Sequence, residues 1–193
     1  MKTRKLLFVA TLLTLAITAC KKETKYGTSI TPLNNVLNAL PASPALEYFR
    51  DEPVILAMQF KSAKDGRITE FGIRAGKGTY KVSLWDSSAL NLISSTSITA
   101  SDSTVFLYKD INDINIVSNK TYIISMFNQT AEGGSGTHVI RGSVATVFPF
   151  TLGDITLEGS YYKTTTNASA FPAGFLYKNL ITGIADFKFE PKL

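Results

Sequence analysis

The 193-residue sequence has a single cysteine, Cys20, and a single histidine, His138. One cysteine excludes a disulfide within the chain and any metal site built from several cysteines. Charged residues are also few, at 18%, whereas hydrophobic residues make up 45%. This composition, together with abundant Ser and Thr, is typical of a secreted β protein with one core. The length fits one domain plus a targeting segment.

The net charge is low once the N-terminal region is set apart. The formal charge is +5, of which three positive charges come from Lys2, Arg4 and Lys5 and a net two from residues 21–25. The remainder is close to neutral. A nucleic-acid-binding domain carries a basic face, so we expect no nucleic acid partner.

The N-terminus has the pattern of a lipoprotein signal peptide. A basic stretch at residues 2–5 precedes an apolar run at 6–17, which is shorter than the roughly 20 residues that a membrane-spanning helix needs. The run ends in Ile17-Thr18-Ala19-Cys20, which resembles the lipobox of bacterial lipoproteins. The small residues suit the peptidase cleft, and the thiol accepts the diacylglycerol. We therefore predict a signal peptide at residues 1–19 and lipidation of Cys20.

The alternative is an ordinary cleaved signal peptide followed by a chance cysteine. Against it, no other cysteine occurs in the chain. More than one acyl chain anchors a protein stably to a membrane. Residue 21 is Lys rather than the Asp that tends to hold lipoproteins at the inner membrane, which favours the outer membrane and leaves either leaflet open.

Residues 20–45 have the composition of a flexible tether. They are polar and contain Pro32, Pro41 and Pro44. The apolar residues at 36, 37 and 40 are compatible with one turn of helix or a first short strand. A spacer of this kind would hold a domain away from the bilayer.

From residue 46 to residue 193 the pattern is that of β-strands separated by turns. Apolar and polar residues alternate, and turn residues such as Asp65-Gly66 recur at short intervals. No amphipathic helix of useful length interrupts them, so we predict an all-β antiparallel sandwich. The expected strands are 54–60, 67–74, 80–84, 92–98, 105–108, 121–127, 139–150, 155–163, 174–177 and 184–189.

Three segments carry a family resemblance. They are Gly-Arg-Ile-Thr-Glu-Phe-Gly-Ile-Arg at 66–74, Tyr-Lys-Val-Ser-Leu-Trp at 80–85 and Lys-Thr-Tyr-Ile-Ile-Ser at 120–125. In order and spacing they resemble the bacterial domain-of-unknown-function 4082 family, over about residues 52–190. The resemblance implies a jelly-roll-like sandwich, often found in extracellular proteins near carbohydrate-related modules, and no assigned activity. A single-domain lipoprotein of this kind is similar to those of gut Bacteroidetes.

Residues suited to catalysis are sparse. His138 follows the Gly-rich segment 132–137, where an exposed loop histidine is a simpler interpretation than a general base or metal ligand. Ser135 lies among glycines, but no helix follows to form a nucleophile elbow. The carboxylate pairs Asp51/Glu52, Asp110/Asp113, Asp154/Glu158 and Asp186/Glu190 lie beside turn residues. We therefore expect no enzymatic activity, with a pair of glycosidase carboxylates as the alternative.

One acidic segment is a weak candidate for a metal. Asp110-Ile111-Asn112-Asp113 places hard oxygen ligands at alternating positions, as Ca²⁺ prefers. It lacks the glycine and the distal glutamate of an EF-hand loop. We expect a solvated turn here and no cofactor, with Ca²⁺ as the alternative.

Aromatic residues provide the better candidates for ligand binding. Trp85 follows the alternation of Lys81 and Ser83, which places the indole on the outer face of its strand. An exposed Trp or Tyr can stack on a sugar ring. Tyr161, Tyr162 and Arg74 complete the candidate site, although Arg74 is also placed to form an ion pair with Glu70 or Asp86.

These observations leave three hypotheses for the function. The first is a membrane-anchored, extracytoplasmic binding module with a glycan as the favoured ligand, indicated by an outward aromatic patch. The second is a structural or adhesive component of a cell-envelope assembly, indicated by an unpaired edge strand. The third and least favoured is a glycan hydrolase, indicated by two facing carboxylates. Fold alone does not decide between them.

Overall fold

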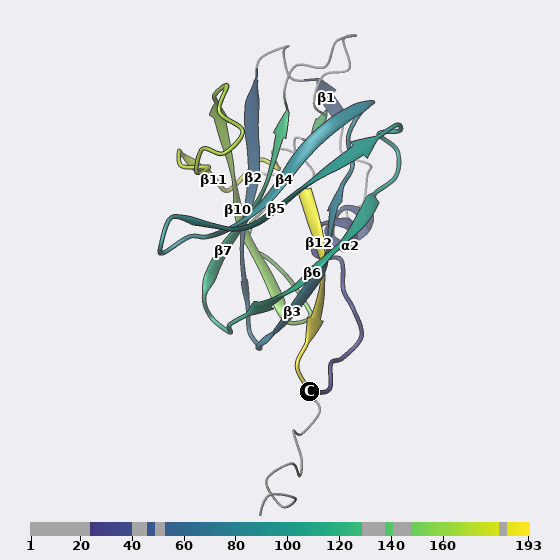
Figure 1. The fold of residues 1–193 in the computed structure, drawn as a ribbon, viewed down its shortest axis with the longest axis vertical. Coiled ribbons are helices and arrows are strands. Elements are labelled where there is room, and N and C mark those ends of the chain that lie inside the picture. The colour runs from purple at the N-terminus through teal and green to yellow at the C-terminus, as the bar shows by residue number, and fades with distance from the viewer. Residues whose placement is uncertain (1–23, 40–45, 49–52, 129–137, 141–147, 182–184) are drawn as a thin grey trace, which may run out of the picture.

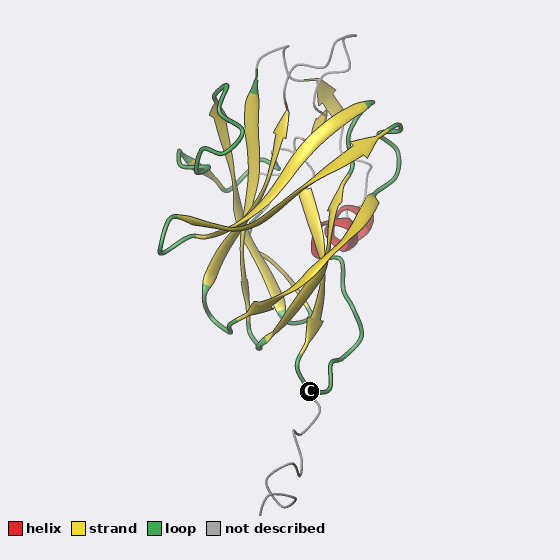
Figure 2. Ribbon diagram, viewed as in Figure 1, coloured by secondary structure: helices red, strands yellow, loops and turns green. Residues whose placement is uncertain are grey.

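The computed structural model describes residues 24–39, 46–48, 53–128, 138–140, 148–181 and 185–193. The predicted signal peptide at 1–19, Cys20, the Asp51/Glu52 pair and the Gly-rich segment 132–137 lie outside the described residues. Within that part of the chain the structure consists mostly of strands, with one short helix at the side of the sheets (Figure 2).

The described elements, in chain order, are one helix followed by twelve strands. Their bounds are α2 (Pro32–Ala39), β1 (Leu46–Tyr48), β2 (Val54–Ser62), β3 (Gly66–Ile73), β4 (Gly78–Asp86), β5 (Asn91–Ala100), β6 (Leu107–Ile116), β7 (Thr121–Asn128), β8 (His138–Ile140), β9 (Phe150–Leu152), β10 (Ile155–Thr164), β11 (Leu176–Tyr177) and β12 (Ala185–Pro191).

The strands form two antiparallel sheets that pack together (Figure 1). The large sheet has the order β11-β10-β2-β7-β4-β5, with β9 paired to β10, and the small sheet has the order β12-β3-β6. A separate short pair joins β1 to β8. The predicted all-β antiparallel sandwich is confirmed.

The core lies between the two sheets and follows the alternation of side chains along each strand. The ring of Phe60 in β2 joins the layers, because its centroid lies 4.4 Å from that of Phe187 in β12 and 5.6 Å from that of Tyr122 in β7. Other fully buried side chains from both sheets surround these rings, among them Leu56, Ile68, Phe71, Tyr80, Leu84 and Phe189.

The chain before α2 is bound to the edge of the small sheet. Ile30 and Phe189 in β12 exchange two backbone hydrogen bonds of 2.9 Å each. The backbone N–H of Leu193 donates to the carbonyl of Lys25 at 3.0 Å. This segment therefore covers the outer edge of β12, which would otherwise present unpaired backbone groups.

Helix α2 continues this packing into the core. Leu33, Val36 and Leu37, spaced three and four residues apart, are all buried against the sandwich. Pro32 stands at the first helical position, where its missing N–H costs nothing. The prediction of a flexible tether over 20–45 is therefore wrong for residues 24–39, and the domain begins before residue 46. The polar residues between the apolar ones resemble a spacer, but the apolar residues are spaced as on one face of a short amphipathic helix.

A buried carboxylate holds the start of this helix. Asp186 in β12 accepts hydrogen bonds from the backbone N–H groups of Leu33 and Asn34, each at 3.0 Å. Its second oxygen also accepts the hydroxyl of Tyr108 in β6 at 2.8 Å. Asp186 therefore satisfies first-turn donors that the helix itself leaves unpaired. Burial raises the pKa of this carboxyl, while these hydrogen bonds act in the opposite direction.

Candidate functional site

Trp85 lies on the predicted face of its strand but is not accessible. Its side chain points away from the main core and packs with Ala57 and Ile123 on the outer face of the large sheet. Phe171 covers it with an edge-on ring at 5.6 Å, and the indole N–H donates to the Ser125 hydroxyl at 2.8 Å. Only 4% of Trp85 is exposed. The prediction of an outward-facing stacking platform is therefore wrong, because a later loop covers the ring.

Tyr161 and Tyr162 point to opposite faces of β10, as neighbours in a strand must. Tyr161 packs against the Trp85 cluster and donates its hydroxyl to Gln59 at 2.6 Å. Burial raises the pKa of Tyr161. Tyr162 packs instead against the core between the sheets. The two tyrosines therefore do not form one binding surface.

Arg74 forms neither of the expected ion pairs. Its guanidinium Nε donates to the carbonyl of Ser103 at 2.7 Å, which ties the end of β3 to the loop after β5. Glu70 is paired with Lys188 at 2.7 Å. Asp86 is paired with Lys120 at 2.6 Å. The hydrogen bond of Arg74 therefore links it to Ser103 and not to Trp85, Tyr161 or Tyr162.

The candidate calcium segment is not a turn. Asp110 and Asp113 lie inside strand β6, on its exposed side, and Asp113 pairs with Arg67 at 2.5 Å. Asp and Asn are typical of turns, but an exposed edge strand also tolerates them. Among the described residues, no group of three or more His, Cys, Asp or Glu side chains is placed to hold a metal ion.

The remaining carboxylates of the predicted pairs serve the fold. Asp154 pairs with Lys64 at 3.4 Å, and Glu158 pairs with Lys61 at 2.8 Å. Glu190 pairs with Arg67 at 2.7 Å. His138, predicted to lie in a loop, has its backbone in β8 opposite Tyr48.

Strand β5 is the most unusual surface of the sandwich. It forms one edge of the large sheet, and in the described part of the chain its only ladder is with β4. Its sequence, Asn-Leu-Ile-Ser-Ser-Thr-Ser-Ile-Thr-Ala, carries no charge and no proline. Leu92 and Ile93 are exposed at its start, and Leu90 is exposed in the preceding turn. Natural edge strands are commonly protected by charges, prolines, bulges or a cover. Residues 91–96 carry no charge and no proline, and among the described strands none pairs with their free side, although a β-bulge lies at Ile93.

The neighbouring edge strand provides a contrast. β6 forms the edge of the small sheet and carries Lys109, Asp110 and Asp113. A shallow groove runs between the two edges, lined by residues 94–96 of β5 and 110–112 of β6. The C-terminal end of β5 is less accessible, because Ile98 and Ala100 are buried there and Lys109 donates to the carbonyl of Ser97 at 2.9 Å. The open part of the edge is thus residues 91–96.

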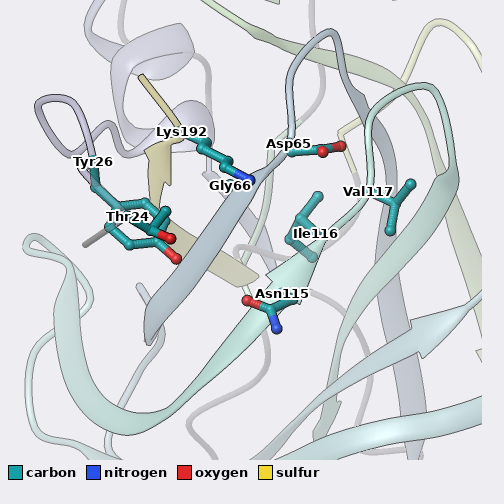
Figure 3. Close-up of a pocket in the computed structure, with 8 residues that line it drawn as sticks. All are labelled: Thr24, Tyr26, Asp65, Gly66, Asn115, Ile116, Val117 and Lys192. Carbon is teal, nitrogen blue, oxygen red and sulfur yellow. The ribbon is translucent and has the colours of Figure 1, made fainter. Parts of the chain in front are cut away.

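A second hollow lies where the two ends of the described chain meet (Figure 3). Tyr26 and Lys192 border it on one side and Asp65 and Val117 on the other. The Asp65 carboxylate is already used, since it accepts the backbone N–H of Ser118 at 2.8 Å. Among the described lining residues there is no pair of groups arranged as nucleophile and base. This hollow therefore offers a polar surface and no catalytic arrangement.

The comparisons with known proteins assign no relative. No protein-family profile matches the chain. No curated protein matches it either. The resemblance to the domain-of-unknown-function 4082 family accordingly stays a prediction. In the part of the chain that the structure describes, no helix is both long and apolar enough to cross a membrane.

Proposed function

We propose that the protein is a lipid-anchored component of an extracytoplasmic envelope assembly, held at the outer membrane through Cys20, and that strand β5 binds an extended segment of a partner protein. The lipobox-like sequence supports the anchor. The single observation that carries the binding role is the open, uncharged edge at residues 91–96. Addition of a strand to such an edge is a recurring mode of peptide recognition.

The energetics suit a partner held at the same membrane. In a regular antiparallel pair every second residue presents both its N–H and its C=O to the partner. A β-bulge at Ile93, where Leu84 pairs with Ser94 and Trp85 with Leu92, interrupts this alternation, so the six-residue edge offers at most about six hydrogen bonds. Each contributes about 0.5–1.5 kcal/mol net, and association itself costs several kcal/mol. The pairing is therefore weak in free solution. Anchoring both partners at one membrane raises their effective concentration, and therefore raises the fraction of the two proteins that is paired.

Photo-crosslinking in the native cells tests this proposal. A photoreactive residue replaces Thr96 in β5 or, as the control, the exposed Thr151 in β9, which pairs with β10 far from β5 in the large sheet. We expect a protein adduct from position 96 that is at least tenfold weaker from position 151, and mass spectrometry should place the other end of the crosslink in an extended segment. An adduct between two copies would identify the partner as the chain itself.

Charged substitutions on the same edge complete the test. Ile93→Lys and Ser95→Lys place charges on exposed positions of β5 and should abolish the adduct from position 96. Thr151→Lys adds the same charge to β9, which pairs with β10, and should leave the adduct from position 96 unchanged. If no adduct forms at position 96, or if the β5 lysines have no effect, strand addition at this edge is wrong.

A glycan-binding role remains a second candidate because of a different aromatic pair. Phe175 is 72% exposed, and its ring lies edge-on to that of Tyr177 in β11 at 5.0 Å. An accessible ring of this kind can stack on a sugar. A glycan array with the chain beginning at Thr24 tests it, with Phe175→Ala as the variant. Binding that survives in Phe175→Ala, or no binding at all, would exclude this aromatic pair as a glycan site.

A further inference from the structure

The two ends of the described chain lie together at one end of the sandwich. The backbone N–H of Leu193 donates to the carbonyl of Lys25, and the C-terminal end of the chain lies at the bottom of Figure 1. We call this end the basal pole and define it as residues 24–26, 63–66, 117–120, 153–154 and 192–193.

Hydrogen bonds join the turns of the basal pole into one surface. The Asn119 N–H donates to the Ser62 carbonyl at 2.7 Å, which ties the β6–β7 turn to the β2–β3 turn. The Ala63 N–H donates to the Asp154 carbonyl at 2.7 Å, which adds the β9–β10 turn. The Lys192 N–H donates to the Asp65 carbonyl at 2.8 Å, which adds the C-terminus. The surface is thus built from segments that the fold holds rigidly.

The basal pole carries exposed apolar side chains and four lysines (Lys25, Lys64, Lys120 and Lys192) against two aspartates (Asp65 and Asp154). Val117 and Leu193 are 54% and 77% exposed. Lys25, Lys64 and Lys192 belong to the same surface, and Lys64 is paired with Asp154 at 3.4 Å. Exposed apolar side chains among lysines are the composition of surfaces that lie in a membrane interface, where the alkyl chains enter the headgroup region and the amines face lipid phosphates.

The length of chain between the predicted anchor and the fold decides how this surface is used. Thr24, the first described residue, is four residues after Cys20. Four residues span about 14 Å when fully extended, which is less than the diameter of a domain of this size, since its radius of gyration is about 15 Å. A tether through residue 45 would have allowed free rotation, but the binding of residues 24–39 to the sandwich removes that freedom.

We propose that the basal pole rests on the lipid bilayer that holds the anchor, with Val117 and Leu193 in contact with the headgroup region. This inference depends on the proposed lipidation of Cys20. It deepens the proposed function, because it fixes the orientation in which the sandwich meets a partner. The β4–β5 hairpin projects from the side of the sandwich, away from the basal pole (Figure 1), so the β5 edge stays accessible.

A fluorescent probe on the full-length lipoprotein tests the contact. The chain has no cysteine other than Cys20, which acylation blocks, so an engineered cysteine can be labelled alone with an environment-sensitive dye. Val117→Cys reports on the basal pole. Val105→Cys is the matched control, because this valine is also about half exposed, at 49%, but lies in the loop between β5 and β6. Leu193→Cys is a second basal probe that leaves every strand unchanged.

The labelled proteins are reconstituted into phosphatidylethanolamine–phosphatidylglycerol vesicles that contain a nitroxide headgroup lipid. We expect quenching at positions 117 and 193 to be at least threefold stronger than at position 105. Equal quenching at the basal and control positions would overturn the inference while leaving the anchor intact. Mass spectrometry of the membrane-extracted protein separates the two cases: an unacylated Cys20 would overturn both the anchor and the basal contact.

Discussion

Removing the N-terminal segment is expected to destabilise the whole sandwich, even though its composition is that of a tether. The test begins with Leu33→Ala. Leu33 in α2 is 1% exposed and packs in the core between the sheets. Truncation of such a leucine leaves a cavity that costs about 2–5 kcal/mol of folding free energy. This is a large share of the about 5–15 kcal/mol that stabilise a typical domain.

The larger perturbation is a chain that begins at Leu46. It loses Leu33, Val36 and Leu37, whose burial contributes about 1.5–3 kcal/mol each, or about 5–9 kcal/mol together as an upper bound. It also exposes the edge of β12 that the segment covers. We expect this chain to be unfolded or aggregated at 25 °C, whereas a chain that begins at Thr24 retains the fold.

Urea unfolding followed by tryptophan fluorescence measures both effects. Trp85 is the only tryptophan, and its burial makes its emission a reporter of the native state. Asn38→Ala is the control in the same helix, because Asn38 is exposed, and its effect should stay within about 0.5 kcal/mol. Equal midpoints for Leu33→Ala and Asn38→Ala, or a cooperative transition in the chain from Leu46, would refute the packing role of α2.

Three further substitutions test other contacts. Asp186→Ala leaves one buried and two partly buried donors without their acceptor, so we expect the free energy of unfolding in urea to fall by at least about 2 kcal/mol; a change below about 0.5 kcal/mol, the range of surface substitutions, would contradict the capping role. The hydrogen-bonded ion pair with Lys120, together with hydrogen bonds from Ser88 and Ala89, lowers the pKa of Asp86 from 3.8 to about 2, so this carboxylate stabilises the fold above pH 3.8 and loses that effect as the pH falls toward 2. The stability difference between wild type and Asp86→Asn, about 1–2 kcal/mol at neutral pH after allowance for solvent screening, should therefore shrink in acid, and a constant difference would contradict the shift. In Gly72→Ala the new methyl group would overlap the ring of Tyr108, so its melting temperature should fall further than that of Gly153→Ala, where the methyl group would make only an ordinary contact with Ile30 at 3.8 Å and the left-handed φ of 56° is the only strain.

The strands were largely predictable, because period-two alternation and turn residues depend on local sequence. The alternation also predicted correctly that Trp85 points away from the main core. It could not predict that Phe171, far away in the chain, would cover the ring. Such coverage depends on the path of a loop, which leaves no periodic signal in the sequence.

The errors elsewhere have a similar cause. Three apolar residues among asparagines and prolines resemble a spacer, and only the buried carboxylate of Asp186, more than 150 residues away, shows why a helix forms there. The sequence predicts a turn at Asp110 and Asp113 because aspartate is common in turns. The same residue type is also stable on an exposed edge strand, so the residue type alone could not distinguish the two. The uncharged run in β5 was visible in the sequence, but which strand lies at an edge is decided by the topology.

The pairing between the N-terminal segment and β12 also has a mechanical consequence. With the proposed lipid on Cys20 as the fixed point, a force that draws the domain from the membrane would enter at Thr24 and run along the segment. The backbone hydrogen bonds of Lys25, Gly27 and Ile30 to the C-terminal strand and its end cross that direction. They are loaded in shear and share the tension, whereas a segment pulled sideways would peel off one bond at a time. The same contacts that complete the small sheet thus make the attachment resistant to pulling.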